Sequence, residues 1–238
     1  MSFPDFSASD AQIQWQRFCD LSWYHDDLGV WLDISRMHVN AADLQQLQPR
    51  MDKAFTAMQE LEAGAIANPD EERQVGHYWL RSPELAPNSE VQQHISREID
   101  LIAAFGRDVI NGTIKAPNGE AFTDVLWIGI GGSGLGPALM IRALQNPGQG
   151  LPFHFFDNVD PNGMSNVLAG LEGRLDRTLV VTVSKSGGTP EPHLGLEQAR
   201  HRLEAAGGQW AGQAVAVTML NSKLDQQAQS EAWLKRFD

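Results

Sequence analysis

Cysteine is nearly absent from this chain: Cys19 is the only one among 238 residues. One thiol cannot form an internal disulfide, and the chain has no C-x-x-C pair, so a disulfide-stabilised scaffold and a cysteine-based metal centre are both excluded. The histidines offer no alternative, because His193 and His201 lie eight residues apart and His25 has no further imidazole or thiol close to it in sequence. We therefore expect no metal site and a reducing compartment.

Long apolar runs are missing as well. No segment approaches the roughly 20 apolar residues that a membrane-spanning helix needs. The first five residues, Met1-Ser2-Phe3-Pro4-Asp5, lack the basic and then apolar pattern of a secretory signal. We expect a cytoplasmic protein with no membrane partner.

Positive charge is scarce. The chain has 18 Lys and Arg against 30 Asp and Glu, which gives a net charge of −12. Broad binding to nucleic acid or to anionic lipid depends on neutralising phosphates with Lys and Arg, so neither is expected as a partner. A phosphorylated ligand would have to be held by a local arrangement of donors.

Residues 1–112 are predicted to form a helical amino-terminal segment. Apolar residues recur there at helical spacing in three stripes, which we interpret as core positions. The stripes are Ile13, Phe18 and Leu21; Leu44, Leu47, Met51, Phe55, Met58 and Leu61; and Val91, Ile95, Ile99, Ile102, Phe105 and Val109. Asparagine, proline and glycine predict breaks at 68–70 and 83–88 and an end near 112.

Residues 113–238 are predicted to form an α/β domain. Apolar runs at 125–129, 153–156, 179–183 and 214–218 alternate with helical patterns at 136–145, 162–171, 190–206 and 222–236. This alternation is typical of right-handed βαβ units, in which helices cover both faces of a parallel sheet. Ligands of such sheets bind at the carboxyl ends of the strands, and the glycine-rich loops of this sequence fall there.

A loop of hydroxyls, glycines and one lysine follows the third of these strands. It reads Ser184-Lys185-Ser186-Gly187-Gly188-Thr189 and leads into a helix that begins with Pro190-Glu191. Glycines let backbone N–H groups turn toward an anion, the hydroxyls and the lysine add donors and charge, and the helix contributes the positive end of its dipole. The pattern predicts a phosphate-binding loop. Thr189 also fits the N-cap of the helix, and the two roles are compatible.

A loop of the same kind lies earlier in the chain, after the first strand; in chain order it is the first loop, and 184–189 is the second. This first loop reads Gly129-Ile130-Gly131-Gly132-Ser133-Gly134-Leu135-Gly136-Pro137, with proline in the first turn of a predicted helix. Two such loops in one parallel sheet predict that a phosphorylated small molecule binds between them.

The first loop also satisfies G-x-G-x-x-G, and Asp157 ends the next strand, so a dinucleotide is a rival ligand. The loop after the third strand is not needed for dinucleotide binding and favours another phosphate ligand. A Walker P-loop is excluded, because Pro137 stands where lysine would follow Gly136. Asp157 and Asp160 are expected to cap or turn the chain rather than to contact ligand.

Three segments resemble the amino-terminal half of the glucose-6-phosphate isomerases. They are Gly129-Ile130-Gly131-Gly132-Ser133-x-Leu135-Gly136-Pro137, then Asn158-Val159-Asp160, then Val183-Ser184-Lys185-Ser186-x-x-Thr189-x-Glu191, with His77-x-x-Leu80-Arg81 upstream. Tyr24-His25 and residues 32–37 are similar to the cyanobacterial branch of the family. The likeness covers nearly all of the chain.

The resemblance implies that residues 113–238 form a first sugar isomerase (SIS) domain, a flavodoxin-like parallel sheet sandwiched by helices. It implies reversible isomerisation of glucose 6-phosphate and fructose 6-phosphate, in glycolysis and gluconeogenesis, without a cofactor and in a homodimer. The positions matching those that hold the sugar's 6-phosphate are Gly131, Gly132, Ser133, Ser184, Lys185, Ser186 and Thr189. Gly134 stands where many members have an acid, and Gly187-Gly188 replace a bulkier pair, which predicts a more flexible loop that still accepts phosphate.

The resemblance also implies that the catalytic groups lie outside this sequence. Family members continue through a second SIS domain, which supplies a glutamate base, a ring-opening histidine, an arginine and a late lysine. None of these motifs occurs by residue 238, so we assign no catalytic residue and expect a fragment that is inactive alone. Its SIS domain is expected to be incomplete, without the fifth parallel strand and with an unfinished sheet edge after residue 218. The alternatives are a non-catalytic sugar-phosphate-binding SIS module and an NAD-binding Rossmann half.

Overall fold

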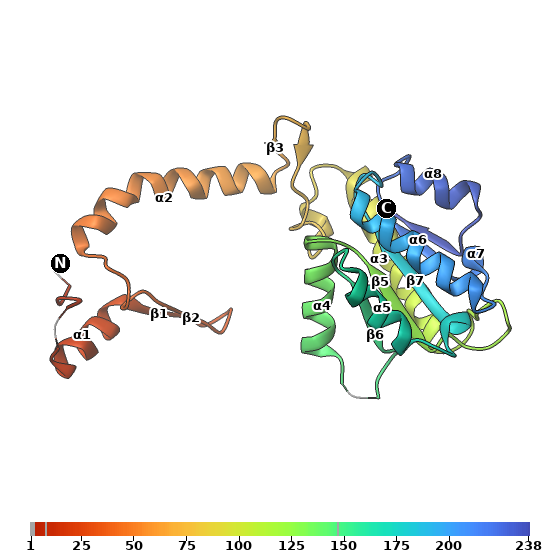
Figure 1. Ribbon diagram of the computed structural model, residues 1–238. Coiled ribbons are helices and arrows are strands. Elements are labelled where there is room, and N and C mark those ends of the chain that lie inside the picture. The colour runs from red at the N-terminus through yellow and green to blue at the C-terminus, as the bar shows by residue number, and fades with distance from the viewer. Residues whose placement is uncertain (1–2, 8, 147) are drawn as a thin grey trace. The chain divides into compact units, whose positions relative to one another are not determined.

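The computed structural model describes residues 3–7, 9–146 and 148–238. The chain forms two compact units, Met1–Gln92 and Gln93–Asp238 (Figure 1). The boundary falls in the first turn of the helix Ser89–Ile110, most of which belongs with the sheet of the second unit.

The described part of the first unit contains two helices, two small hairpins and a 3₁₀ turn. Its elements are α1 (Ala11–Leu21), β1 (Ser22–His25), β2 (Val30–Asp33), α2 (Ala41–Glu62), β3 (Ile66–Asn68), β4 (Arg73–Gln74) and the 3₁₀ turn η1 (Pro83–Leu85). The helical segment is confirmed. The antiparallel pairs β1-β2 and β3-β4 were not predicted. In the first pair, Trp23, Tyr24 and Trp31 favour strands, and Gly29 supplies the positive φ of the turn.

Arg17 is the most deeply buried side chain described in the first unit. Its guanidinium donates hydrogen bonds to the backbone carbonyls of Pro4, Ser35, Met37 and Val39, at 2.8 to 2.9 Å. This single side chain therefore ties the segment after β2 to α1.

Helix α2 buries none of its residues within the described part of the chain, and Phe55 is 62% exposed. The prediction that its apolar stripe is core is therefore wrong here. The helix is specified locally, because Asn40 and Asp43 form a capping box at its start.

The second unit is built on a five-stranded parallel sheet. Its elements are α3 (Ser89–Ile110), β5 (Asp124–Ile128), α4 (Gly132–Leu144), β6 (Phe153–Phe156), α5 (Pro161–Gly170), η2 (Leu175–Arg177), β7 (Thr178–Val183), α6 (Pro190–Ala205), α7 (Trp210–Gln213), β8 (Ala214–Val217), α8 (Lys223–Ser230) and β9 (Lys235–Phe237). The strand order is β6-β5-β7-β8-β9, and every adjacent pair is parallel. The predicted α/β fold is confirmed.

The fifth strand corrects the expectation of an unfinished sheet. The helix predicted over 222–236 ends at Ser230, and Lys235–Phe237 forms β9 beside β8. The chain reverses at Ala232, which has a positive φ of 53°, and the Trp233 N–H bonds back to the Ala228 carbonyl. A strand of three residues, two of them basic, carries too little alternation to be recognised in the sequence.

Alternating side chains divide the sheet into two faces. On one face, Leu126, Val180 and Ala216 pack against α5, α6, α7 and α8. On the other, Val125, Val181 and their neighbours pack against α3. In Figure 1, α6 (blue) and α3 (yellow) lie on opposite sides of the strands.

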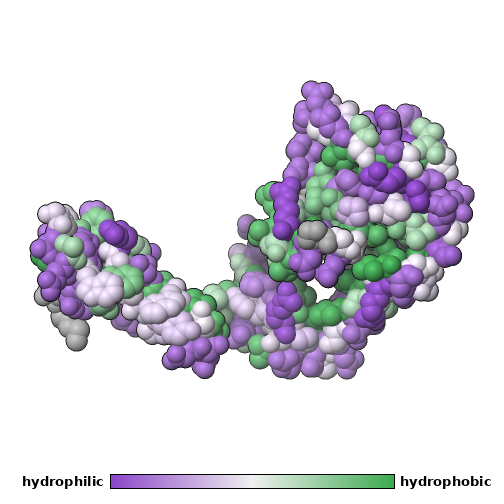
Figure 2. All heavy atoms as spheres, turned by 90° about the horizontal axis from the view of Figure 1, so that it is seen from below, coloured by the Kyte–Doolittle hydropathy of each residue, from purple (hydrophilic) through white to green (hydrophobic). Residues whose placement is uncertain are grey.

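Helix α3 covers its face of the sheet only in part. Between α3 and α4 lies an apolar groove of about 420 Å³, lined by residues such as Phe105, Trp127, Ile141 and Val181. Figure 2 shows the hollow in this unit with hydrophobic side chains gathered around it.

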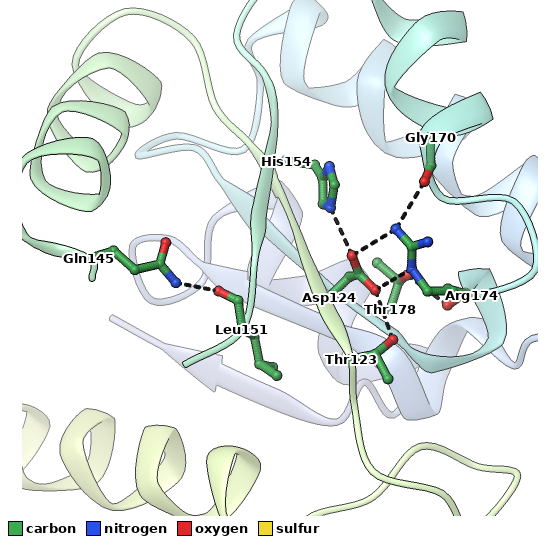
Figure 3. A network of polar contacts seen from close by, with 8 residues as sticks. All are labelled: Thr123, Asp124, Gln145, Leu151, His154, Gly170, Arg174 and Thr178. Atoms are coloured by element: carbon green, nitrogen blue, oxygen red, sulfur yellow. Dashed lines mark hydrogen bonds and ion pairs between the residues drawn. The ribbon is translucent and has the colours of Figure 1, made fainter. Parts of the chain in front are cut away.

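Asp124 organises the amino-terminal edge of the sheet (Figure 3). Its buried carboxylate accepts hydrogen bonds from His154 Nε2 and Arg174 Nε, both at 2.9 Å, and from Thr123 Oγ1 at 2.8 Å. Burial alone would raise the pKa of Asp124, but the hydrogen bonds from Arg174, His154 and Thr123 outweigh it and lower that pKa below 3.8. The network joins β5, β6 and the connection into β7 at the end opposite the glycine loops.

Candidate phosphate-binding site

The two glycine loops leave neighbouring strands at the same edge of the sheet. Strands β5 and β7 are adjacent, and Ile128 of β5 is the register partner of Thr182 of β7. The chain turns from β5 toward β6 in one direction and from β7 toward β8 in the other, so the loops flank the topological switch point. This is the position at which parallel sheets bind ligands.

The first loop is a tight turn into α4. Gly131 occupies its N-cap with φ of 56°, a conformation that favours glycine, and Gly132 is the first residue of the helix. In this turn the Ser133 and Gly134 N–H groups donate to the Ile130 and Gly131 carbonyls, so an anion would meet the N–H groups of Gly131 and Gly132 at the positive end of the helix dipole. The Trp127 indole N–H donates to the Ser133 carbonyl at 2.7 Å and holds the loop from the opposite side.

Gly134 is required by close packing. A Cβ at this position would collide with the Gly129 carbonyl oxygen, and a Cβ at Gly129 would meet the Ser133 carbonyl. In this chain, therefore, a side chain at position 134 has no room unless the turn shifts.

The second loop folds around its own hydroxyls. Ser184 is buried and its Oγ accepts the Gly187 N–H at 3.2 Å, while the Ser186 Oγ accepts the Gly188 N–H at 3.2 Å. A hydroxyl oxygen that accepts a hydrogen bond still has its own hydrogen to donate. Lys185 is exposed, so its ammonium can approach a ligand from solvent.

Thr189 takes the N-cap position of α6 with Pro190 after it, as predicted, but its side chain makes no capping hydrogen bond. Its exposed hydroxyl lies beside the helix N-terminus. The amino ends of α4 and α6 therefore both open at the edge where the loops lie, and both dipoles favour an anion there.

The acidic residues near the loops have structural partners. Asp160 caps α5 by accepting the Gly163 N–H at 2.6 Å, which confirms its expected capping role. Asp157 accepts from the Asn158 side-chain amide at 2.7 Å. Lys185 is the one basic residue of the two loop sequences.

A third segment supports the site and was missed in the sequence. Thr218, directly after β8, donates from Oγ1 to the Ser184 carbonyl at 2.6 Å and lies 2.7 Å from the Ser222 Oγ. The available signal was Ser222-Lys223-Leu224-Asp225, a serine and an acid at the spacing of a helix start.

The described residues form neither a metal-binding cluster nor a membrane-crossing helix. No group of three or more His, Cys, Asp or Glu side chains there is arranged to hold a metal ion. Across the same residues, no helix combines the length and the apolar character needed to cross a bilayer.

Curated proteins similar to this chain are glucose-6-phosphate isomerases. Those of Synechococcus sp. strain CC9605, Synechococcus sp. strain CC9902 and Parasynechococcus marenigrum strain WH8102 are 94%, 80% and 77% identical over the whole chain. The chain spans 43 to 45% of the length of these relatives.

Two solved structures are similar to this chain. A glucose-6-phosphate isomerase from Chlamydia trachomatis superposes with a TM-score of 0.78 at 28% identity, over 99% of this chain and 45% of that one. A hypothetical protein from Thermus thermophilus superposes with a TM-score of 0.56 at 27% identity, over 82% of this chain and 39% of that one. The family described as phosphoglucose isomerase matches residues 33–231. This chain belongs to the phosphoglucose isomerase family.

Proposed function

We propose that the chain supplies the phosphate-binding half of a glucose-6-phosphate isomerase. The observation that carries the proposal is the adjacency of the two loops, which follow register partners Ile128 and Thr182 at one edge of the sheet. The identity of the relatives makes glucose 6-phosphate and fructose 6-phosphate the candidate ligands. The working form of such an enzyme is proposed to be a homodimer in the cytoplasm.

In this proposal one phosphoryl group is gripped from both loops. The backbone at Gly131 and Gly132 and the Ser133 side chain contact it from the side of α4. The second loop contributes the side chains of Ser184, Lys185, Ser186 and Thr189. Backbone donors, hydroxyls, one ammonium and two helix N-termini together offset the net negative charge of the chain.

The phosphate does not react. Isomerisation opens the sugar ring and moves a proton between two neighbouring carbons through an enediol, at the far end of the substrate. Holding the phosphate fixes the position of that end against a carboxylate base, and orientation of this kind contributes several kcal/mol, on the order of 7 or more in favourable cases.

The residues that would carry proton transfer are proposed to lie outside this sequence, because the described loops offer hydroxyls, amides and one lysine but no positioned base. The chain alone is then proposed to bind sugar phosphate and not to turn it over. Membership of the phosphoglucose isomerase family favours this function over the dinucleotide and regulatory alternatives.

Calorimetric titration of the chain with fructose 6-phosphate tests the proposal, with fructose and NADH as controls. Saturable binding of the phosphate ester, absent with fructose and with NADH, is expected. A coupled isomerase assay on the same preparation is expected to give no turnover. Binding of NADH that depends on Asp157, or equal binding of fructose, would overturn the phosphate assignment.

A further inference from the structure

The backbone of the second phosphate loop is fixed from the side of β8. The Ser184 N–H donates to the Val217 carbonyl at 3.1 Å, and the Thr218 Oγ1 donates to the Ser184 carbonyl at 2.6 Å. The Met219 N–H donates to the Lys185 carbonyl at 3.2 Å. Two successive carbonyls of the loop, those of Ser184 and Lys185, therefore point toward the segment that follows β8.

The direction of the carbonyls determines the direction of the next amides. The described chain contains no cis peptide, so the C=O of one residue and the N–H of the next point in opposite directions. With both carbonyls aimed at the β8 side, the N–H groups of Lys185 and Ser186 are directed to the other side of β7. That side is occupied by β5 and its glycine loop.

The hydroxyl of Thr218 is itself oriented. A carbonyl oxygen can only accept, so the single hydroxyl hydrogen of Thr218 is used on Ser184. The Ser222 hydroxyl, 2.7 Å away, must then donate to the Thr218 Oγ1, and the Ser222 Oγ in turn accepts the Asp225 N–H at 3.0 Å as the N-cap of α8. Each group therefore donates to the next: the Asp225 N–H to Ser222, the Ser222 hydroxyl to Thr218, and the Thr218 hydroxyl to the Ser184 carbonyl of the loop.

A steric contact supports the same arrangement. Gly187 has φ of 64° and packs so closely on the start of α8 that a Cβ would collide with the Leu224 backbone N. The loop thus rests on α8 at Gly187 and is hydrogen-bonded to the segment before α8 at Ser184 and Lys185.

We propose that Thr218 is a positioning residue for phosphate binding: held by Ser222, it fixes the Ser184 carbonyl and so aims the Lys185 and Ser186 amides at the phosphoryl group. This inference rests on the proposed function, because it assigns a purpose to the orientation of a loop that binds phosphate. Thr218 itself does not contact the ligand.

Thr218→Val in the 238-residue chain removes the donor and keeps the shape, while Thr218→Ser keeps the hydroxyl. Thr178→Val is a matched control, because Thr178 is also buried, on β7, and donates to the Arg174 carbonyl at 2.9 Å, at the opposite edge of the sheet. Each protein is titrated with fructose 6-phosphate by calorimetry and by amide NMR. The expected result is a Kd about tenfold higher for Thr218→Val, and a Kd within about threefold of the original for Thr218→Ser and Thr178→Val.

The NMR readout separates positioning from general stability. Ligand-induced shifts of the Ser186 amide are expected in the original chain and in Thr218→Ser, and to be reduced in Thr218→Val but not in Thr178→Val. If Thr218→Val does not fold, Ser222→Ala provides the test, since it removes the donor to Thr218 and should raise the Kd while leaving the protein folded.

A Kd for folded Thr218→Val equal to that of the original chain, or an equal loss in Thr178→Val, would overturn the positioning role. If Thr218→Val does not fold, an unchanged Kd for Ser222→Ala would overturn the positioning role as well. Failure of the original chain to bind fructose 6-phosphate would instead overturn the proposed function.

Discussion

Ile128 and Thr182 are register partners on adjacent parallel strands, and each is followed within two residues by one of the two glycine loops. Because parallel strands end at a common edge, this pairing brings together segments that lie about 50 residues apart in sequence. Everything proposed for the site follows from this relationship.

Removing one hydroxyl or the one ammonium should weaken the grip on phosphate. Ser184→Ala and Lys185→Ala are each expected to raise the Kd for fructose 6-phosphate by about tenfold to 100-fold, the range for a hydrogen bond to a charged group. Ser230→Ala and Lys115→Ala are controls for the loss of a hydroxyl and of an ammonium outside the two loops, at exposed positions. Calorimetry provides the measurement, and equal affinities in all four variants would contradict the assignment.

Gly134→Ala should distort the first loop, because its Cβ would collide with the Gly129 carbonyl. We expect loss of detectable sugar-phosphate binding and a lower free energy of unfolding. Gly136→Ala is the control in the same helix: a Cβ there meets nothing within 4 Å, so the alanine should stabilise the protein by about 0.5 to 1 kcal/mol. Urea unfolding and calorimetry distinguish the two, and unchanged binding in Gly134→Ala would show that the turn can relax.

Asp124→Asn should destabilise the second unit. Its buried carboxylate is held by Arg174 and His154, and removal of its charge should cost about 2 to 4 kcal/mol at neutral pH. The pKa of Asp124 is lowered in the folded chain, so its stabilisation is present above the unfolded value near 3.8 and is lost as the pH falls through the lower folded value.

The difference in unfolding free energy between the original chain and Asp124→Asn should therefore shrink as the pH falls below about 3.8. Asp100→Asn, at an exposed position of α3, should behave like the original chain throughout. Urea unfolding across the acid range is the measurement, and a difference that does not change with pH would argue against a charged Asp124.

Phe237→Ala tests the fifth strand. Phe237 is buried and its ring lies 5.5 Å from that of Phe105 on α3. Truncation should lower the free energy of unfolding by about 2 to 4 kcal/mol, somewhat less than for a central strand, because β9 is an edge strand. Leu220→Ala, at a side chain that is 61% exposed, should change it little. Equal effects of the two substitutions would mean that β9 is not docked in solution.

The sequence was most informative where local and global signals agree. Strand β7 consists mainly of buried β-branched residues and is followed by a glycine-containing loop that leads into a helix. These signals agree, so its place in a parallel sheet was predictable. Strand β9 was not, because Lys235 and Arg236 carry no strand signal and only the free edge of β8 makes them extended. The hairpin β1-β2 was not predicted either, because all of residues 1–112 were interpreted as a helical segment.

For the site, the residues expected to contact phosphate were predicted from the sequence, but the residues that hold the loop were not. Ser133 stands out because it lies between Gly132 and Gly134, and Ser184 because it opens a loop of hydroxyls, one lysine and two glycines. Thr218 lies in another loop, and its role depends on a hydrogen bond across 34 residues that no local pattern encodes. Likewise, Gly134 was interpreted as a source of flexibility, and only the contact with Gly129 reveals a packing requirement.

The most direct test is an amide NMR titration of the chain with fructose 6-phosphate, followed by inorganic phosphate. The amides of Gly131, Gly132, Ser184 and Ser186 should shift together on addition of fructose 6-phosphate and saturate with one Kd. Inorganic phosphate should compete for the same site and shift the same amides. Shifts confined to one loop, or two loops that titrate with different affinities, would contradict a single shared phosphate site.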